Sequence, residues 1–188
     1  MPACVKNKRP IAALLLLLLA LPAGADFTVT EIKPRIEGKT LVLNGKLDLA
    51  LTPKVEEALT KGIRLDITID VRLTRKRWYI WNQGVGSWTL HRRIWYHALS
   101  GQYLVSTSAS DPDNRESHGS MLEALKALGT LDDLKLPLEG DAAAEGEYSV
   151  ELRAGLDIEA LPTPLRPVAY TSLDWRLNSG WSTWKFAP

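Results

Sequence analysis

The segment 75–106 carries the side chains best suited to chemistry at a surface. It holds four of the seven tryptophans and most of the clustered positive charge. Arginine forms bidentate hydrogen bonds with carboxylates and phosphates, and tryptophan offers a large ring for stacking or for packing against a cation. These residue types predict a contact surface for an anion, a glycan or a protein. The candidate binding residues are Arg75, Arg77, Trp78, Trp81, Trp88, Arg92, Arg93 and Trp95.

A hairpin within this segment would bring two arginines face to face. If Trp81 and Trp88 flank the loop 82–87, the register places Arg77 opposite Arg92. Two opposed cations repel each other unless an acid or a bound anion lies between them. Alternatively, these arginines lie past the edge of the core, with their stems over tryptophan rings and their head groups in water or beside acids. Both interpretations stay open.

The sequence offers poor candidates for catalysis or metal binding. His91 and His97 are six residues apart on one expected strand, which separates them by about 20 Å and prevents a shared metal or a dyad. His118 lacks the G-x-S-x-G context of a nucleophile elbow. The segment 111–122 begins like a calcium loop but has Glu116 where a glycine is needed. We therefore expect no catalytic residues, no metal and no cofactor, and a hydrolase using His91 or His118 is only a third hypothesis.

The first 25 residues have the form of a secretory signal peptide. Lys6, Lys8 and Arg9 precede the unbroken apolar run 11–21, and small residues lead to a cleavage position after Ala25. The apolar run is shorter than the roughly 20 residues that a membrane-spanning helix needs. We expect export to the periplasm with cleavage, and the alternative is an inner-membrane protein anchored by the uncleaved signal.

The composition of the remaining chain fits one globular domain. Removing three cations from the 23 leaves a charge of 20 − 22 = −2, which argues against a nucleic-acid binder. The only cysteine, Cys4, lies in the signal segment, so no disulfide is available and the core must stabilise the fold alone. We expect a single β-rich domain over 26–188.

Alternating apolar residues predict strands over 41–51, 63–73 and 148–156. A helix N-cap at Thr52 followed by Pro53, and a capping box that begins at Ser120, predict two short helices. The fold class is therefore mostly β, an antiparallel β-sandwich that is immunoglobulin-like in general architecture, with two short helices. The alternative is an α+β fold with a single sheet.

The local patterns also predict details of the chain path. Ser100-Gly101 is expected as a two-residue turn that pairs Ala98 with Tyr103. Three prolines in 161–167 argue against regular structure there. A final hairpin is expected to pair 169–177 with 181–186, and the C-terminal tryptophans Trp175, Trp181 and Trp184 are expected in the core or in hairpin pairs.

Two motifs carry a family resemblance that extends over nearly all of the mature chain. These are YHAL-x-x-QY at 96–103 and DW-x-L-x-SGW at 174–181, and the helix-plus-strand segment 52–73 occurs in the same order. The chain resembles a proteobacterial family of exported proteins catalogued as domain of unknown function 4390. The resemblance implies a Gram-negative envelope protein, associated with genes for a nitrogen-regulation type sensor kinase. It implies no catalytic residues.

The expected function is non-enzymatic binding in the periplasm. The aromatic and basic hairpin 75–95 would dock on an envelope sensor kinase or another membrane protein. The alternative is a glycan- or anionic-lipid-binding module, in which Trp81 and Trp88 stack on the ligand while Arg77 and Arg92 hold phosphate or carboxylate. No nucleic-acid partner is expected, and the oligomeric state stays open.

Overall fold

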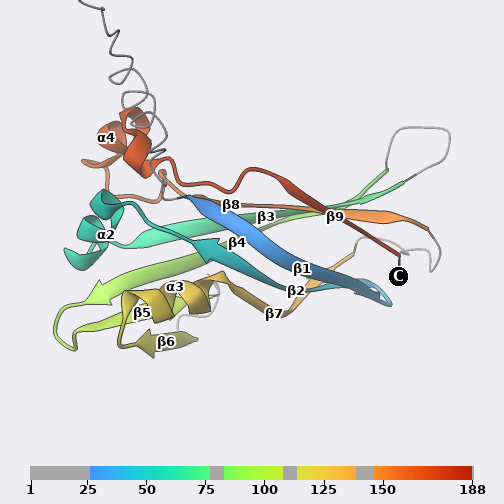
Figure 1. Ribbon diagram of the computed structural model, residues 1–188, viewed down its shortest axis with the longest axis horizontal. Coiled ribbons are helices and arrows are strands. Elements are labelled where there is room, and N and C mark those ends of the chain that lie inside the picture. The colour runs from blue at the N-terminus through green and yellow to red at the C-terminus, as the bar shows by residue number, and fades with distance from the viewer. Residues whose placement is uncertain (1–25, 77–82, 108–113, 139–145, 188) are drawn as a thin grey trace, which may run out of the picture.

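Two antiparallel sheets pack together in the computed structural model, which describes residues 26–76, 83–107, 114–138 and 146–187 (Figure 1). The predicted sandwich is confirmed, and the single-sheet alternative is wrong. The smaller sheet has the order β1 (Phe27–Glu37), β2 (Thr40–Leu49) and β7 (Thr130–Pro137). The larger sheet has the order β6 (Arg115–His118), β5 (Gln102–Ser106), β4 (Gln83–His97), β3 (Leu65–Arg75), β8 (Tyr148–Leu156) and β9 (Ser182–Phe186).

Strand β3 lies in the middle of the larger sheet and supplies much of the core. Its inward side chains, Leu65, Ile67, Ile69, Val71 and Leu73, are all 0% exposed. The intervening residues point to the outward face of the sheet. Leucines of β2 close the core from the smaller sheet. The strands predicted from period-two patterns over 41–51, 63–73 and 148–156 are therefore confirmed, with small shifts at their ends.

The two predicted helices begin at their predicted caps. Helix α2 (Pro53–Thr60) follows Thr52, whose Oγ1 accepts a hydrogen bond from Val55 N at 3.3 Å. Helix α3 (Met121–Gly129) follows Ser120, whose Oγ accepts one from Glu123 N at 3.3 Å. Both hydroxyls satisfy backbone donors that a helix start leaves free. Among the described residues, no helix is both long enough and apolar enough to span a membrane.

The predicted strand 169–177 is wrong. This stretch contains helix α4 (Arg166–Thr171) and the short 3₁₀ helix η2 (Leu173–Trp175), which lie with α2 at one end of the sandwich (Figure 1). Pro167 sits in the first turn of α4, where its missing N–H costs nothing, so proline near 167 did not exclude a helix. Strand β9 pairs with β8 instead.

The predicted pairing of the central hairpin is also wrong. Strand β4 begins at Gln83, so most of the expected loop 82–87 is strand. Arg92 lies opposite Ile67, and Trp88 lies opposite Val71. The expected pairing of Arg92 with Arg77 is therefore wrong, because Ile67 occupies the position opposite Arg92. Arg77 itself lies outside the described residues. Glycines in 83–87 suggested a loop, but the long β3 strand pairs with this stretch through a register shift near Leu73.

The next hairpin exists, but its turn is longer than predicted. His97 pairs with Gln102 and Tyr96 pairs with Tyr103, so four residues connect the strands instead of two. Gly101 has a φ of 66°, in the left-handed region that favours glycine. The predicted pair of Ala98 and Tyr103 is wrong by two positions, which keeps each side chain on its predicted face.

Candidate functional site

The eight residues predicted as a contact surface do not form one cluster in the described chain. Arg77, Trp78 and Trp81 lie outside the described residues. The other five are Arg75, Trp88, Arg92, Arg93 and Trp95. The alternation of β4 sends Trp88 and Arg92 inward, toward the smaller sheet and α3, and sends Arg93 and Trp95 outward. Arg75 is half-buried at the end of β3, with its guanidinium 5.9 Å from the Tyr148 ring centre.

Arg92 is buried, with 6% of its surface exposed. Its Nη1 donates hydrogen bonds to the carbonyl oxygens of Leu128 and Thr130, the second at 2.7 Å. These carbonyls lie where α3 ends, and a helix C-terminus carries partial negative charge that favours a cation. Burial lowers the pKa of Arg92 to about 10, although the nearby Glu116 raises it. Arg92 therefore connects α3 to the larger sheet through these hydrogen bonds.

Trp88 links the two sheets. Its ring is half-buried and packs against the core, and Nε1 donates a hydrogen bond to Pro137 O at 3.2 Å. Gly86 makes room for this ring, because a Cβ atom at that position would overlap it. The donor and much of the ring are already engaged within the fold. This geometry does not give Trp88 the exposed stacking face that the glycan hypothesis needs.

The outward face of the larger sheet carries a different cluster of arginines and tryptophans. Cross-strand register aligns them, because residues directly opposite each other in neighbouring strands share a face. Two of the six members, Arg93 and Trp95, belong to the predicted set. We call this cluster the arginine–tryptophan face: Arg72, Arg93, Trp95, Arg115, Arg153 and Trp181.

Trp181 lies between two arginines of this face. The guanidinium of Arg72 is 4.1 Å from the ring centre and that of Arg153 is 4.8 Å away. Arg153 also pairs with Asp70, Nη2 to Oδ2, at 2.7 Å. Burial raises the pKa of Asp70, but hydrogen bonds from Arg153 and Thr89 outweigh it, and the pKa lies below its usual value. Trp181 stays 37% exposed, which makes it the most open aromatic of this face.

The other end of the face repeats this arrangement. Arg93 forms a bidentate pair with Asp66, with Nε to Oδ1 at 2.5 Å and Nη2 to Oδ2 at 3.1 Å. The hydrogen bond with Asp66 raises the pKa of Arg93. The guanidinium of Arg115 lies 5.8 Å from the Trp95 ring centre. The paired acids fix Arg93 and Arg153, whereas Arg72 and Arg115 form no ion pair among the described residues.

Charge on this outward face is positive. Alternation puts five cationic side chains there and three anionic ones, a balance of +2, while the chain after residue 25 carries −2. The cations are Arg72, Arg93, Arg115, Arg153 and Lys185, and the anions are Asp66, Asp70 and Glu151. A face of this kind attracts acidic partners.

A cavity of about 400 Å³ adjoins the face at the Gly155 end of β8. Among the described residues that line it, the charged ones are Arg153 and Arg176, and none is acidic. Thr68, Asn178 and Trp175 add hydroxyl, amide and indole groups. The Trp175 Nε1 is buried without a hydrogen-bond partner. Polar groups that are mostly donors suit a carboxylate or phosphate oxygen.

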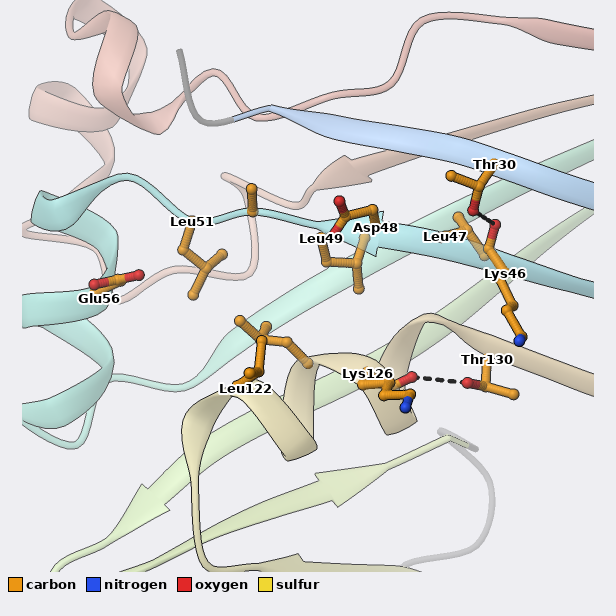
Figure 2. A pocket seen from close by; sticks show the side chains of 12 residues that line it. Thr30, Lys46, Leu47, Asp48, Leu49, Leu51, Glu56, Leu122, Lys126 and Thr130 are labelled. Carbon is orange, nitrogen blue, oxygen red and sulfur yellow. Dashed lines mark hydrogen bonds between the residues drawn. The ribbon is translucent and has the colours of Figure 1, made fainter. Parts of the chain in front are cut away.

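A second cavity of about 550 Å³ lies between β2 and α3, on the other side of the molecule's core. Figure 2 shows Leu49 and Leu51 on one wall and Leu122 on the other, with Lys46 and Lys126 at the end near Thr130. We call this cavity the leucine groove. The sequence patterns did not reveal it, because Leu47, Leu49 and Leu51 alternate like ordinary core residues. Leu122 gave no signal either: its spacing to Leu125 and Leu128 predicts that it lies on the buried side of the helix, but it is 78% exposed.

Among the histidines of the described residues, His118 lies beside an acid. His91 and His97 are exposed on β4, and His118 Nε2 lies 3.5 Å from Glu116 Oε2. Within residues 26–76, 83–107, 114–138 and 146–187, no group of three or more His, Cys, Asp or Glu residues is arranged to hold a metal ion.

Comparison with known proteins gives one match. No curated protein and no solved structure matches the chain. One family model, described as domain of unknown function (DUF4390), matches residues 24–185, which include every strand and helix described above except the last residue of β9. Since the match covers most of the chain, the protein belongs to the DUF4390 family.

Proposed function

We propose that this chain is a non-enzymatic binding protein of the periplasm that docks on an acidic surface of an envelope membrane protein. The contact surface is the arginine–tryptophan face. One observation carries the proposal: guanidinium groups and indole rings line an exposed sheet face that holds more cations than anions. Arginine and tryptophan are the residue types that most often dominate the energy of protein interfaces.

The geometry favours a protein over a glycan as the partner. A sugar ring stacks on a free aromatic face, but guanidinium groups lie over Trp181 and beside Trp95. A sugar would therefore have to displace these guanidinium groups from the rings. An acidic protein side chain would not, because a carboxylate can bind the N–H groups at the rim of a stacked guanidinium. Asp66 and Asp70 hold Arg93 and Arg153 in place, which lowers the entropy cost of binding.

The cavity beside Arg153 and Arg176 supports the acidic character of the partner. A carboxylate entering it would meet two guanidinium groups and no competing acid in the lining. Arg176 Nη2 donates to Tyr170 O at 3.2 Å, and this contact orients the guanidinium, which has further N–H donors that can bind a ligand. This cavity is where we expect a side chain of the partner to anchor.

Photocrosslinking in the envelope tests the docking surface. A photoreactive amino acid replaces Thr183, which is exposed on β9 next to Trp181, and in a control replaces Thr28, which is exposed on the outward side of β1. We expect one defined protein adduct from position 183 and none from position 28. The double reversal Arg72→Glu, Arg115→Glu should reduce that adduct at least about tenfold, because opposite charges at the interface then become like charges.

A matched reversal on the smaller sheet controls for total charge. Lys33→Glu with Lys135→Glu makes the same change in net charge on the opposite outward face and should leave the adduct unchanged. Melting curves confirm that each variant folds. Equal adducts from both positions, or an adduct indifferent to the Arg72 and Arg115 reversal, would contradict the proposal. A lipid or glycan adduct in place of a protein would show the alternative binding module instead.

A further inference from the structure

The leucine groove is a mostly apolar opening and takes no part in the docking proposal. It lies where β7 begins: Lys46 pairs with Thr130, the first residue of β7, and beyond that point α3 packs beside β2 in place of a strand. The cavity of about 550 Å³ is within the roughly 300–1,000 Å³ range of small-molecule sites. The exchange of a strand for a helix leaves this space open.

Leucine side chains form the walls of the groove. Leu47, Leu49 and Leu51 line one wall, and Leu122 and Leu125 line the other. Leu122 is 78% exposed although it belongs to an amphipathic helix whose other apolar residues are packed. Five leucine side chains, with no aromatic ring among the described lining residues, suit a flexible aliphatic ligand. Each methylene removed from water there would contribute about 0.8 kcal/mol.

The two ends of the groove carry opposite charges. Lys46 and Lys126 lie together at the Thr130 end, while Glu56 lies at the opposite end on α2 (Figure 2). Neither lysine forms an ion pair among the described residues, and Asp48, which is exposed on β2, pairs with neither. The hydroxyls of Thr30 and Thr130 already donate to the carbonyls of these lysines, at 2.8 Å each. The two ammonium groups are thus the donors available for an anion.

We propose that the leucine groove binds one fatty acid, with the acyl chain along the leucine walls and the carboxylate between Lys46 and Lys126. Charge complementarity sets the orientation, because the ammonium pair attracts the carboxylate and Glu56 repels it from the far end. A peptide is less suited, because buried peptide groups would need hydrogen-bond partners that leucine side chains do not supply. The site is separate from the arginine–tryptophan face, so the two proposals fail independently.

Titration calorimetry of the mature protein with dodecanoate, and with dodecanol as an uncharged probe, tests this site. We expect one dodecanoate per chain and at least about fivefold weaker binding of dodecanol, since only the carboxylate gains the two ammonium contacts. Lys46→Gln with Lys126→Gln should remove that difference. Leu122→Asn should weaken both probes, because it puts an amide in the apolar wall.

Two exposed positions provide matched controls. Leu99→Asn changes a leucine that is 95% exposed in the turn after β4, and Lys135→Gln changes an exposed lysine of β7 outside the groove. Neither should alter the affinity for dodecanoate. Native mass spectrometry of protein purified from the envelope adds a second measurement, and a mass increment equal to a fatty acid would support the proposal.

Three results would overturn it. One is the absence of saturable dodecanoate binding. Another is binding that the substitutions at Lys46, Lys126 and Leu122 leave unchanged. The third is a bound peptide in the native mass spectrum that competes with dodecanoate, which would make the groove a peptide site.

Discussion

Arg92→Ala is expected to lower the free energy of unfolding by about 3–4 kcal/mol, as measured by urea denaturation. The substitution removes the Arg92 donor from the carbonyl oxygens of Leu128 and Thr130 at a site that is buried around Leu128 and half-buried around Thr130. It also removes the side chain that fills the space between β4 and α3, and a cavity there adds its own cost. We expect α3 to detach first, because Arg92 is its charged contact with the larger sheet.

Arg92→Met separates these contributions. Methionine fills most of the volume without donating hydrogen bonds, and it removes the burial of charge that lowers the pKa of Arg92 to about 10. We expect a loss of about 1–2 kcal/mol, smaller than for alanine, since relief of desolvation offsets part of the two lost hydrogen bonds. His91→Ala, on the exposed side of the same strand, is the control. If the methionine variant is as stable as the unsubstituted protein, the hydrogen bonds of Arg92 stabilise the fold by no more than the free-energy cost of burying its guanidinium.

The fold could be predicted because side-chain alternation records burial directly. The residues of β3 follow a period of two, and five of them are fully buried. The helix caps at Thr52 and Ser120 are local signals and needed no knowledge of the rest of the chain. The helix over 166–171 was missed because proline is a strong breaker inside a helix but is compatible with its first turn.

Strand register could not be predicted because alternation fixes the face of a residue and not its partner. Arg92 lies on the core side of β4. Its expected partner was Arg77, ten positions from the actual partner, Ile67. An even shift preserves every face, so the hydrophobic pattern fits both pairings equally well. Only the tertiary contacts of Arg92 with α3 distinguish them.

The arginine–tryptophan face was beyond sequence reasoning for the same reason. Arg72 and Trp181 are more than a hundred residues apart, and they meet only because β8 joins β3 to β9. The clustering of tryptophans in 75–95 directed attention to a single hairpin. In the structure, alternate side chains of β4 point into the core. The side chains between them point outward, to a face that several strands form together.

Gly129→Ala is expected to lower the free energy of unfolding by about 2–3 kcal/mol. An added methyl group would overlap the carbonyl oxygen of Leu47, a backbone atom of β2 that cannot rotate away. In an exposed helix the same change would stabilise the protein by up to about 1 kcal/mol, because alanine is the better helix former. A destabilising result therefore reports the close packing of α3 on β2 and not helix propensity.

Gly119→Ala supplies the control for this substitution. A Cβ atom at Gly119 would meet no other atom within 4 Å, so the change should alter the free energy of unfolding by less than about 0.5 kcal/mol. Because Leu47 also lines the leucine groove, displacement of α3 in Gly129→Ala should widen that groove and weaken dodecanoate binding. A Gly129→Ala protein as stable as the unsubstituted one would mean that α3 lies farther from β2 than described, and the groove would then be wider than an acyl chain can fill.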